Sequence, residues 1–400
     1  MGTRRLLLPA VKVAVAVAAA ASFGGPLPPA FSQEGPPPSE SSSLATSDSR
    51  AAAERGLAWL VRNQQEDGSW LCDVGFKLND GYKVIQVRKP HVGVTALAGT
   101  AFLASGSVPG RGPYAKQVER CLDFILASQD ATGFIGKSDT RMYSHAFAAM
   151  FLAEVYGTTR DKRVRDALQR AVEFTYKAQN QQGGWRYVPN AEDSDMSITV
   201  CQVMALRAAK NKGIAVPKES IDAAVDYVLK SAVTEDDPRD GFEPGAFRYQ
   251  YQTKNAQAEA MTRTSFALTA AGLTTLYGAG VYTDLDIREF CRNRGLKFAN
   301  NKVPSFRNML DYVIRHYGDV ARGRYRDHYF FYYGNYYAVQ AMYIAGDPWW
   351  SKYYLRLRDD VVGRQEADGS WPSDVGDAYS TAVSTIILQV PNSYLPIFQR

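Results

Sequence analysis

The sequence predicts an all-α protein that folds as a six-fold α/α toroid, in which an outer ring of helices surrounds an inner ring. Three features lead to this prediction. The pattern Gln-x-x-x-Gly-x-Trp recurs along the chain, helices with one apolar face alternate with helices that are apolar on nearly every side, and no linker divides residues 48–400. Because short connections make successive helices antiparallel, all inner helices should begin at one end of the ring.

The first 47 residues are not expected to belong to this fold. Residues 1–32 are predicted to be a secretory signal peptide, since Arg4 and Arg5 precede a short apolar run and small residues around Ala30 have the spacing of a cleavage site. Residues 33–47 are rich in Pro and Ser, which is typical of a flexible linker. We therefore expect a secreted or periplasmic protein without a transmembrane span in its mature chain, with an uncleaved anchor as the alternative.

The composition is that of an ordinary globular protein. Of 400 residues, 46% are hydrophobic and the net charge is +5, so the chain can bury a large core and shows no basic excess that would indicate nucleic-acid binding. The four cysteines lie far apart and form no CxxC pair typical of zinc or thioredoxin chemistry: Cys72, Cys121, Cys201 and Cys291. Disulfides and buried thiols both remain open for them.

The repeated motif follows predicted amphipathic helices. It has three full copies, at Gln64/Gly68/Trp70, Gln179/Gly183/Trp185 and Gln365/Gly369/Trp371, and a weaker copy at Gln129/Gly133 with Ile135 in place of Trp. The Gly suits a helix end because it adopts the left-handed conformation without steric cost.

Two kinds of helix can be assigned in order. The amphipathic segments, predicted to be outer helices, are 51–63, 114–128, 162–178, 218–231, 284–300 and 349–363, and 304–318 is a further candidate. The segments that are apolar nearly all round, predicted to be inner helices, are 92–105, 143–156, 196–209, 264–277, 329–345 and 378–390.

The motif and the alternation resemble a known family. The Gln-x-x-x-Gly-x-Trp copies are similar to the QW repeats of squalene and oxidosqualene cyclases, and the alternating helices resemble the toroid that these enzymes share with protein prenyltransferase β subunits. The resemblance covers most of residues 51–389. It implies a toroid in which Gln and Trp tie neighbouring outer helices together, and an isoprenoid or other lipid as ligand.

The family's catalytic motif is matched in part. Squalene-type cyclases carry Asp-x-Asp-Asp-Thr-Ala at the start of an inner helix, and this chain has Asp193-Ser194-Asp195-Met196 at the matching place. The resemblance implies that Asp195 is the proton donor and Asp193 its helper, although Met196 replaces the third Asp. Zinc-dependent prenylation is not expected, because Asp195 replaces the family's Cys ligand. The chain also has room for one barrel where triterpene cyclases have two.

The same carboxylates have a structural interpretation. Asp is a preferred N-cap, and a carboxylate in the first turn is favoured by the helix dipole by about 0.3 to 1 kcal/mol. Capping and catalysis therefore both remain open for Asp193 and Asp195.

Histidines gather near the predicted inner-helix starts. His91, His145 and His328 lie there, as Asp195 does, whereas His316 lies elsewhere. The set of His91, His145 and Asp195 offers zinc ligands, and His145 could act in acid–base catalysis. The alternative is that each His forms a hydrogen bond at the rim. Zinc is the sole cofactor that this pattern indicates.

Aromatic residues are concentrated in residues 325–337, which lead into the fifth inner helix. Such residues could stabilise a cation, stack on a ligand or pack between helices. The candidate ligand-binding residues at the mouth of the ring are Tyr143, Arg263, His328, Tyr329, Tyr332, Tyr333 and Tyr379. Two long insertions, 71–90 and 234–260, are expected to cover or shape the same opening.

Three functions compete. The first is an isoprenoid- or lipid-active cyclase-like enzyme, which needs a deep apolar cavity with Asp195 in its wall. The second is a non-catalytic binding toroid whose cavity is filled by inner-helix side chains. The third is a polysaccharide lyase or glycoside hydrolase, which needs an open groove lined by Tyr and Arg. In each case where a ligand binds, it is a hydrophobic or aromatic-stacking molecule or a sugar in the central cavity.

Overall fold

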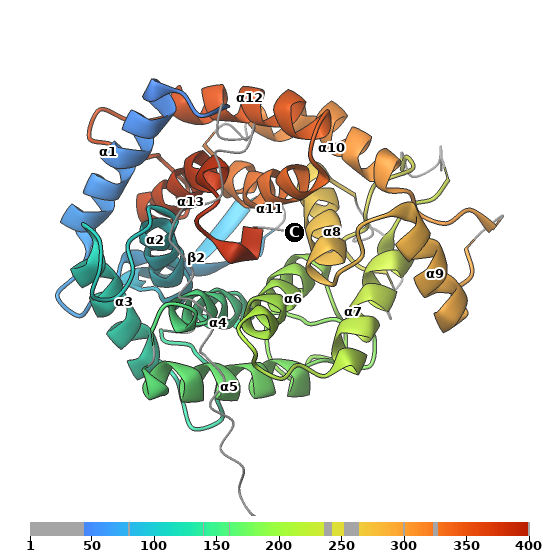
Figure 1. Ribbon diagram of the computed structural model, residues 1–400, viewed down its shortest axis with the longest axis horizontal. Helices are drawn as coiled ribbons and strands as arrows, with labels where there is room; N and C mark the ends of the chain where they lie inside the picture. The colour runs from blue at the N-terminus through green and yellow to red at the C-terminus, as the bar shows by residue number, and fades with distance from the viewer. Residues whose placement is uncertain are drawn as a thin grey trace, which may run out of the picture. The chain divides into compact units, whose positions relative to one another are not determined.

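Six inner helices form a closed ring in the computed structural model (Figure 1). Each contacts the next, and the last contacts the first. They are α2 (Val92–Ala104), α4 (Met142–Tyr156), α6 (Met196–Asn211), α8 (Phe266–Gly278), α11 (Tyr329–Ala345) and α13 (Asp377–Gln389). Every residue of α2 is buried, because this helix packs on other helices on all sides.

The structure describes residues 44–78, 81–138, 140–159, 161–235, 242–251, 264–298, 301–322 and 327–398. The predicted signal peptide, most of the predicted linker and Arg263 lie outside these ranges. Among the described residues, none of the helices has the length and apolar character needed to cross a membrane.

An outer ring surrounds the inner one, as predicted. Its helices are amphipathic and turn their apolar face inward, as in α5, where Val164, Leu168 and Val172 are buried. They are α1 (Ser47–Asn63), α3 (Ala115–Ala127), α5 (Lys162–Lys177), α7 (Lys218–Ser231), α10 (Phe306–Ala321) and α12 (Trp349–Val362). The six-fold α/α toroid is therefore confirmed.

The fifth outer position corrects the helix assignment. We expected residues 284–300 there, but α9 (Asp284–Arg294) buries only Ile287 and Cys291 and lies outside the ring. Instead α10, the further candidate, packs on α8, α11 and α12. Both segments have apolar residues at helical spacing, and α10 occupies the position because its apolar face is the larger one.

The repeated Gln joins one outer helix to the next. In all four copies its Nε2 donates to the carbonyl of the Gly four residues later and to a carbonyl of the following outer helix. The second bonds run from Gln64 to Gln117 O at 3.1 Å, Gln129 to Ala167 O at 2.8 Å, Gln179 to Ser220 O at 2.8 Å and Gln365 to Ala52 O at 2.9 Å.

The repeated Trp joins the outer helix to the inner one. In Trp185, Nε1 donates to Thr175 O at 2.8 Å on the preceding outer helix, and the backbone N–H donates to Thr199 Oγ1 at 3.3 Å on the following inner helix. Trp70 and Trp371 repeat both bonds with equivalent partners. The repeat therefore fixes where α2, α6 and α13 begin.

A further copy without Gln or Trp lies between α7 and α10. Gly245 has a φ of +96°, and a Cβ there would lie 2.3 Å from Asn308 O. Phe247 takes the place of Trp, and its N–H donates to Thr269 Oγ1 at 3.2 Å. The backbone contact of the repeat thus persists where two of its three side chains have changed.

The two ends of the ring differ. Near the inner-helix starts, β1 (Leu71–Leu78) and β2 (Gly81–Pro90) form an antiparallel hairpin, which is the predicted insertion 71–90. At the other end, η5 (Val390–Asn392) and η6 (Pro396–Phe398) pack on inner helices and bury Leu395 and Ile397. An interior cavity is therefore approached from the hairpin side.

Replacing Gly183 by Ala is expected to destabilise the protein more than replacing Gly213 by Ala. Both residues have positive φ, +91° and +82°, so backbone strain of about 1–2 kcal/mol is common to both changes. A Cβ at Gly183 would lie 2.2 Å from Ala223 O, whereas one at Gly213 meets no atom within 4 Å. The clash should add about 2 kcal/mol, measured by denaturant unfolding. Equal losses would contradict the role assigned to this contact.

Candidate functional site

A cavity of about 510 Å³ lies inside the inner ring at the hairpin end. All six inner helices contribute residues from their N-terminal halves, and the hairpin supplies another part of the wall. Deep in the cavity the wall is apolar or aromatic, formed by Leu97, Phe147, Tyr336 and Val383. The open cavity differs from the filled interior that the non-catalytic interpretation expected.

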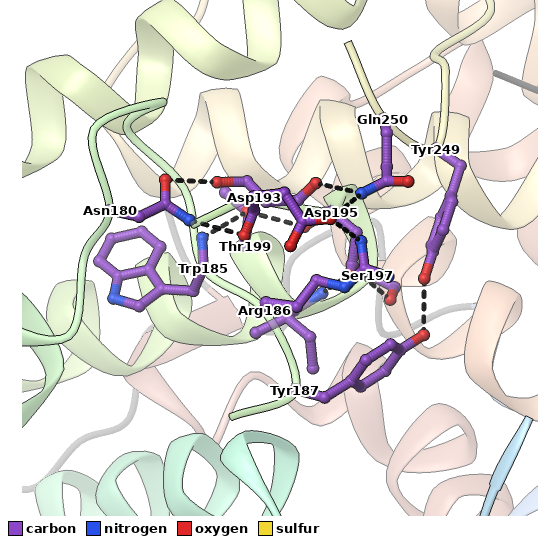
Figure 2. A network of polar contacts seen from close by, with 12 residues as sticks. Asn180, Trp185, Arg186, Tyr187, Asp193, Asp195, Ser197, Thr199, Tyr249 and Gln250 are labelled. Atoms are coloured by element: carbon purple, nitrogen blue, oxygen red, sulfur yellow. Dashed lines mark hydrogen bonds and ion pairs between the residues drawn. The ribbon is translucent and has the colours of Figure 1, made fainter. Parts of the chain in front are cut away.

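Asp195 caps α6 beside this cavity (Figure 2). Its Oδ1 accepts hydrogen bonds from Ile198 N at 2.9 Å and from Ser197 Oγ at 2.5 Å. Its Oδ2 lies 3.6 Å from Arg186 Nε. The side chain is fully buried and does not itself line the cavity. The capping prediction for Asp195 is therefore confirmed.

Burial makes this carboxylate unusual. It raises the pKa of Asp195 from 3.8 to about 6, against the lowering effects of the Ser197 hydrogen bond and the Arg186 charge. Asp195 is therefore mostly ionised at neutral pH and becomes protonated in mildly acidic solution.

A chain of hydroxyl groups connects Asp195 to the cavity. Tyr143 OH donates to Ser197 Oγ at 2.6 Å, and Ser197 Oγ donates to Asp195 Oδ1. Both Tyr143 and Ser197 line the cavity. Burial raises the pKa of Tyr143 well above 10, so the phenol keeps the proton that it donates. Its oxygen consequently faces a ligand as a hydrogen-bond acceptor.

Asp193 has a different environment. Its Oδ2 accepts from Arg186 Nη1 at 2.9 Å and from Gln250 Nε2 at 3.0 Å, and nearly half of the side chain is exposed (Figure 2). Arg186 thus bridges Asp193 and Asp195. The resemblance implied that Asp193 assists Asp195, and the link between them is this shared guanidinium.

Two tyrosines complete the wall next to Tyr143. Tyr187 OH and Tyr249 OH are 2.6 Å apart, and the Arg186 guanidinium lies over both rings, 5.4 and 6.0 Å from their centroids. Burial, then the Asp195 charge, raises the pKa of Tyr187 to about 12. Both phenols therefore stay neutral and line the cavity.

The histidines and Asp195 do not converge. His91 caps α2 and lines the cavity, with Nδ1 accepting from Val94 N at 3.3 Å. His145 is buried away from the cavity, with Nδ1 accepting from Ile135 N at 3.1 Å and Nε2 2.9 Å from Thr175 Oγ1. Burial lowers the pKa of both imidazoles to about 4.

The zinc hypothesis is not supported by this arrangement. Among the described residues, none of the groups of three or more His, Cys, Asp or Glu could hold a metal ion. His145 instead occupies the position that Thr199 has in the next repeat, where it accepts the N–H of the residue that replaces Trp.

The predicted aromatic residues divide into two groups. Tyr329, Tyr333 and Tyr379 line the cavity, and Tyr333 OH donates to Ser197 O at 3.2 Å. Tyr332 and His328 do not: Tyr332 OH donates to Pro372 O at 2.8 Å, and His328 caps α11 with its Nε2 3.5 Å from Asp374 Oδ2.

Several residues of the wall were not singled out from the sequence, among them Ser197, Tyr187, Tyr249 and His316. His316 was set apart because it lies far from an inner-helix start, yet α10 brings it to the mouth, where Nδ1 lies 2.7 Å from Asp319 Oδ2. Ser197 had a local signal, since it follows the capping Asp195 by two residues.

Comparison with known proteins shows the fold. The model of the family described as pectic acid lyase matches residues 144–208, from α4 to α6. No curated protein matches the chain.

Solved structures share the toroid at low identity. An inactive variant of an α-1,6-mannanase of Salegentibacter sp., in complex with α-1,6-mannotetrose, is 11% identical with a TM-score of 0.55, covering 87% of this chain and 100% of the mannanase. A GH76 α-mannanase of Bacteroides thetaiotaomicron is 9% identical with a TM-score of 0.57, covering 86% and 96%. A type II terpene cyclase variant from Scytonema, with geranylgeranyl dihydroxybenzoate bound, is 12% identical with a TM-score of 0.51, covering 87% and 98%. The chain is thus an α/α toroid similar in fold to both classes of enzyme.

Replacing Asp195 by Asn should change how stability depends on pH. A carboxyl whose pKa is 3.8 when unfolded and about 6 when folded favours folding in its neutral form. This contribution is present below pH 4 and is lost as the pH rises to about 6, a change of about 3 kcal/mol. Asn keeps an acceptor for Ser197 and Ile198 but does not ionise.

We therefore expect the wild type to lose about 2 kcal/mol relative to Asp195→Asn between pH 4 and pH 7, since part of the change already lies below pH 4. Urea unfolding at the two pH values measures the difference. If the unfolding free energies of wild type and variant differed by the same amount at both pH values, the buried carboxyl would not titrate in this range.

Proposed function

We propose that this toroid binds an elongated, mostly apolar small molecule, of the isoprenoid or lipid class, whose polar end donates a hydrogen bond to Tyr143. The observation that carries the proposal is the chain Tyr143–Ser197–Asp195 in the wall of a pocket whose deeper lining is apolar and aromatic. A volume of about 510 Å³ is in the range of pockets that enclose small ligands.

The lining favours an apolar ligand. Deep side chains such as Leu97, Phe147 and Val383 offer no hydrogen bonds, so a sugar placed there would lose its contacts with water without replacement. An isoprenoid chain gains free energy by entering the same space. The bound geranylgeranyl dihydroxybenzoate of the terpene cyclase is a ligand of this shape class, with a long apolar chain and hydroxyl groups at one end.

The hydrogen-bond directions define the polar end. Ser197 donates to Asp195 and Tyr143 donates to Ser197, so each hydroxyl has used its proton. A ligand hydroxyl or amine can donate a hydrogen bond to Tyr143, whereas a ligand acceptor such as an ester carbonyl finds no donor there. We therefore infer that the ligand carries a donor.

In this proposal Asp195 is a proton acceptor, whereas the resemblance implied an acid that protonates an alkene. It is ionised at neutral pH, it lies behind Ser197, and its Oδ1 already accepts two hydrogen bonds. The chain could pass the proton of a bound hydroxyl from Tyr143 through Ser197 to Asp195, which is general base catalysis. Protonation of an alkene would need the carboxyl itself in the cavity.

Farnesol and its hydrocarbon counterpart farnesene test this assignment. The wild type should bind farnesol more tightly than farnesene, and Tyr143→Phe should remove most of that preference, about tenfold in dissociation constant. Farnesene affinity should be unchanged in the variant. Tyr394→Phe, at an exposed position, is the matched control. Equal binding of both probes by the wild type would overturn the donor assignment, and no binding of either would overturn the apolar pocket.

A second candidate, a lyase acting on a uronic-acid polymer, is favoured by one observation. The pectic acid lyase model matches residues 144–208, which include Asp195, Ser197 and Tyr187. Such a reaction needs a base and a cation that neutralises the uronate. Arg141 lines the cavity, but Asp73 and Asp319 line it as well and would repel a uronate that enters it.

Incubation with polygalacturonate separates the two candidates. A lyase produces a conjugated double bond that absorbs in the ultraviolet, and our proposal expects no such product from the wild type. Product formation that Asp195→Asn abolishes would establish the lyase and displace the lipid-binding assignment.

A further inference from the structure

Exposed apolar side chains gather around the mouth of the pocket. Eight large apolar side chains are exposed in the part of the chain that the structure describes, and five of these belong to segments that line the mouth. Val84, Ile85 and Val87 are in the hairpin, with exposed fractions of 37%, 44% and 66%. Val188 follows Tyr187, and Tyr251 lies two residues after Tyr249; both Tyr187 and Tyr249 line the cavity.

The hairpin also carries positive charge. Lys83, Arg88 and Lys89 are exposed and flank the exposed apolar residues of β2 on both sides in the sequence. Asp73 is the sole acidic residue among the hairpin side chains that the structure describes, and its Oδ1 accepts from Arg88 N at 2.9 Å. In the described sheet β2 pairs with β1 alone. This strand thus presents a basic and apolar surface.

The same hairpin forms part of the pocket wall. Cys72, Val74 and Tyr82 line the cavity, while Ile85 and Val87 extend into solvent. A surface that contacts the hairpin therefore lies next to the pocket entrance. This position is important for an apolar ligand, because such a ligand dissolves poorly in water and is scarce there.

We propose that the mouth, with β2 foremost, docks on an anionic lipid bilayer, from which the ligand enters the pocket. A bilayer accommodates both features at once, since β-branched side chains enter the boundary of the acyl region while Lys and Arg contact anionic headgroups. The docking is peripheral. The docking proposal rests on the proposed function only for the identity of the ligand that is exchanged, because binding of the protein to the bilayer can be measured without a ligand.

Flotation of the full chain with vesicles tests the docking. The protein should float with vesicles of phosphatidylcholine and phosphatidylglycerol, less with phosphatidylcholine alone, and the binding should weaken in high salt. The double variant Ile85→Asp/Val87→Asp should lose at least tenfold in vesicle affinity, and Lys89→Glu about tenfold on the anionic vesicles.

Two variants serve as matched controls. Leu285→Asp changes an equally exposed apolar residue on α9, and Lys352→Glu changes an exposed cation on α12. Both should bind vesicles like the wild type, and thermal unfolding should show that all variants are folded.

Absence of flotation, or equal losses in the hairpin and control variants, would overturn the docking surface. Farnesol binding measured without vesicles is independent of this result. If the hairpin variants bind farnesol normally but do not float, the docking proposal holds. If farnesol does not bind while flotation follows the hairpin, the pocket assignment alone fails.

Discussion

The close approach of one backbone to the next outer helix is the contact on which the rest of the fold depends. At Gly68, Gly133, Gly183 and Gly369 a Cβ would lie within 2.7 Å of a carbonyl oxygen of the neighbouring helix. The adjoining Gln then bridges the same two segments. Because each junction leaves no room for a side chain, the spacing of the outer helices is set by backbone atoms and repeats around the ring.

This junction also determines where chemistry can occur. It places the residue after the turn against the first turn of α2, α4, α6, α8 and α13. All six inner helices contribute residues from their N-terminal halves to one cavity. Asp195 caps α6 at one of these starts, whereas α4 and α13 begin without a side-chain cap. The candidate site is thus a capping position whose side chain gained further partners, Ser197 and Arg186. In the preceding inner helix, α4, His145 lies at the position equivalent to Thr199, and its two ring nitrogens serve the packing.

Much of this fold could be predicted from the sequence, because periodicity and the repeated motif are local signals. The inner helices, for example, lie where the fully apolar segments predicted them. Features without a local signal were missed: the junction at Gly245 has neither Gln nor Trp, and α9 and α10 differ in how much surface they bury rather than in period. In the site, Asp195, Tyr143 and Tyr333 were singled out by position. Their connection through Ser197 joins residues 54 and 136 positions apart, which no spacing in the sequence reveals.

The closure of the ring has a consequence for how the protein reaches its native state. The inner ring is completed where α13 meets α2, and the outer ring where Gln365 bonds to Ala52 O, 313 residues earlier in the chain. Contacts between such distant segments are formed slowly, because a large loss of chain entropy precedes them. The segments from α1 to α12 can pair with their neighbours as they are synthesised, but they enclose no pocket. An emerging polypeptide therefore acquires its interior cavity only in the last step of folding, when α13 meets α2.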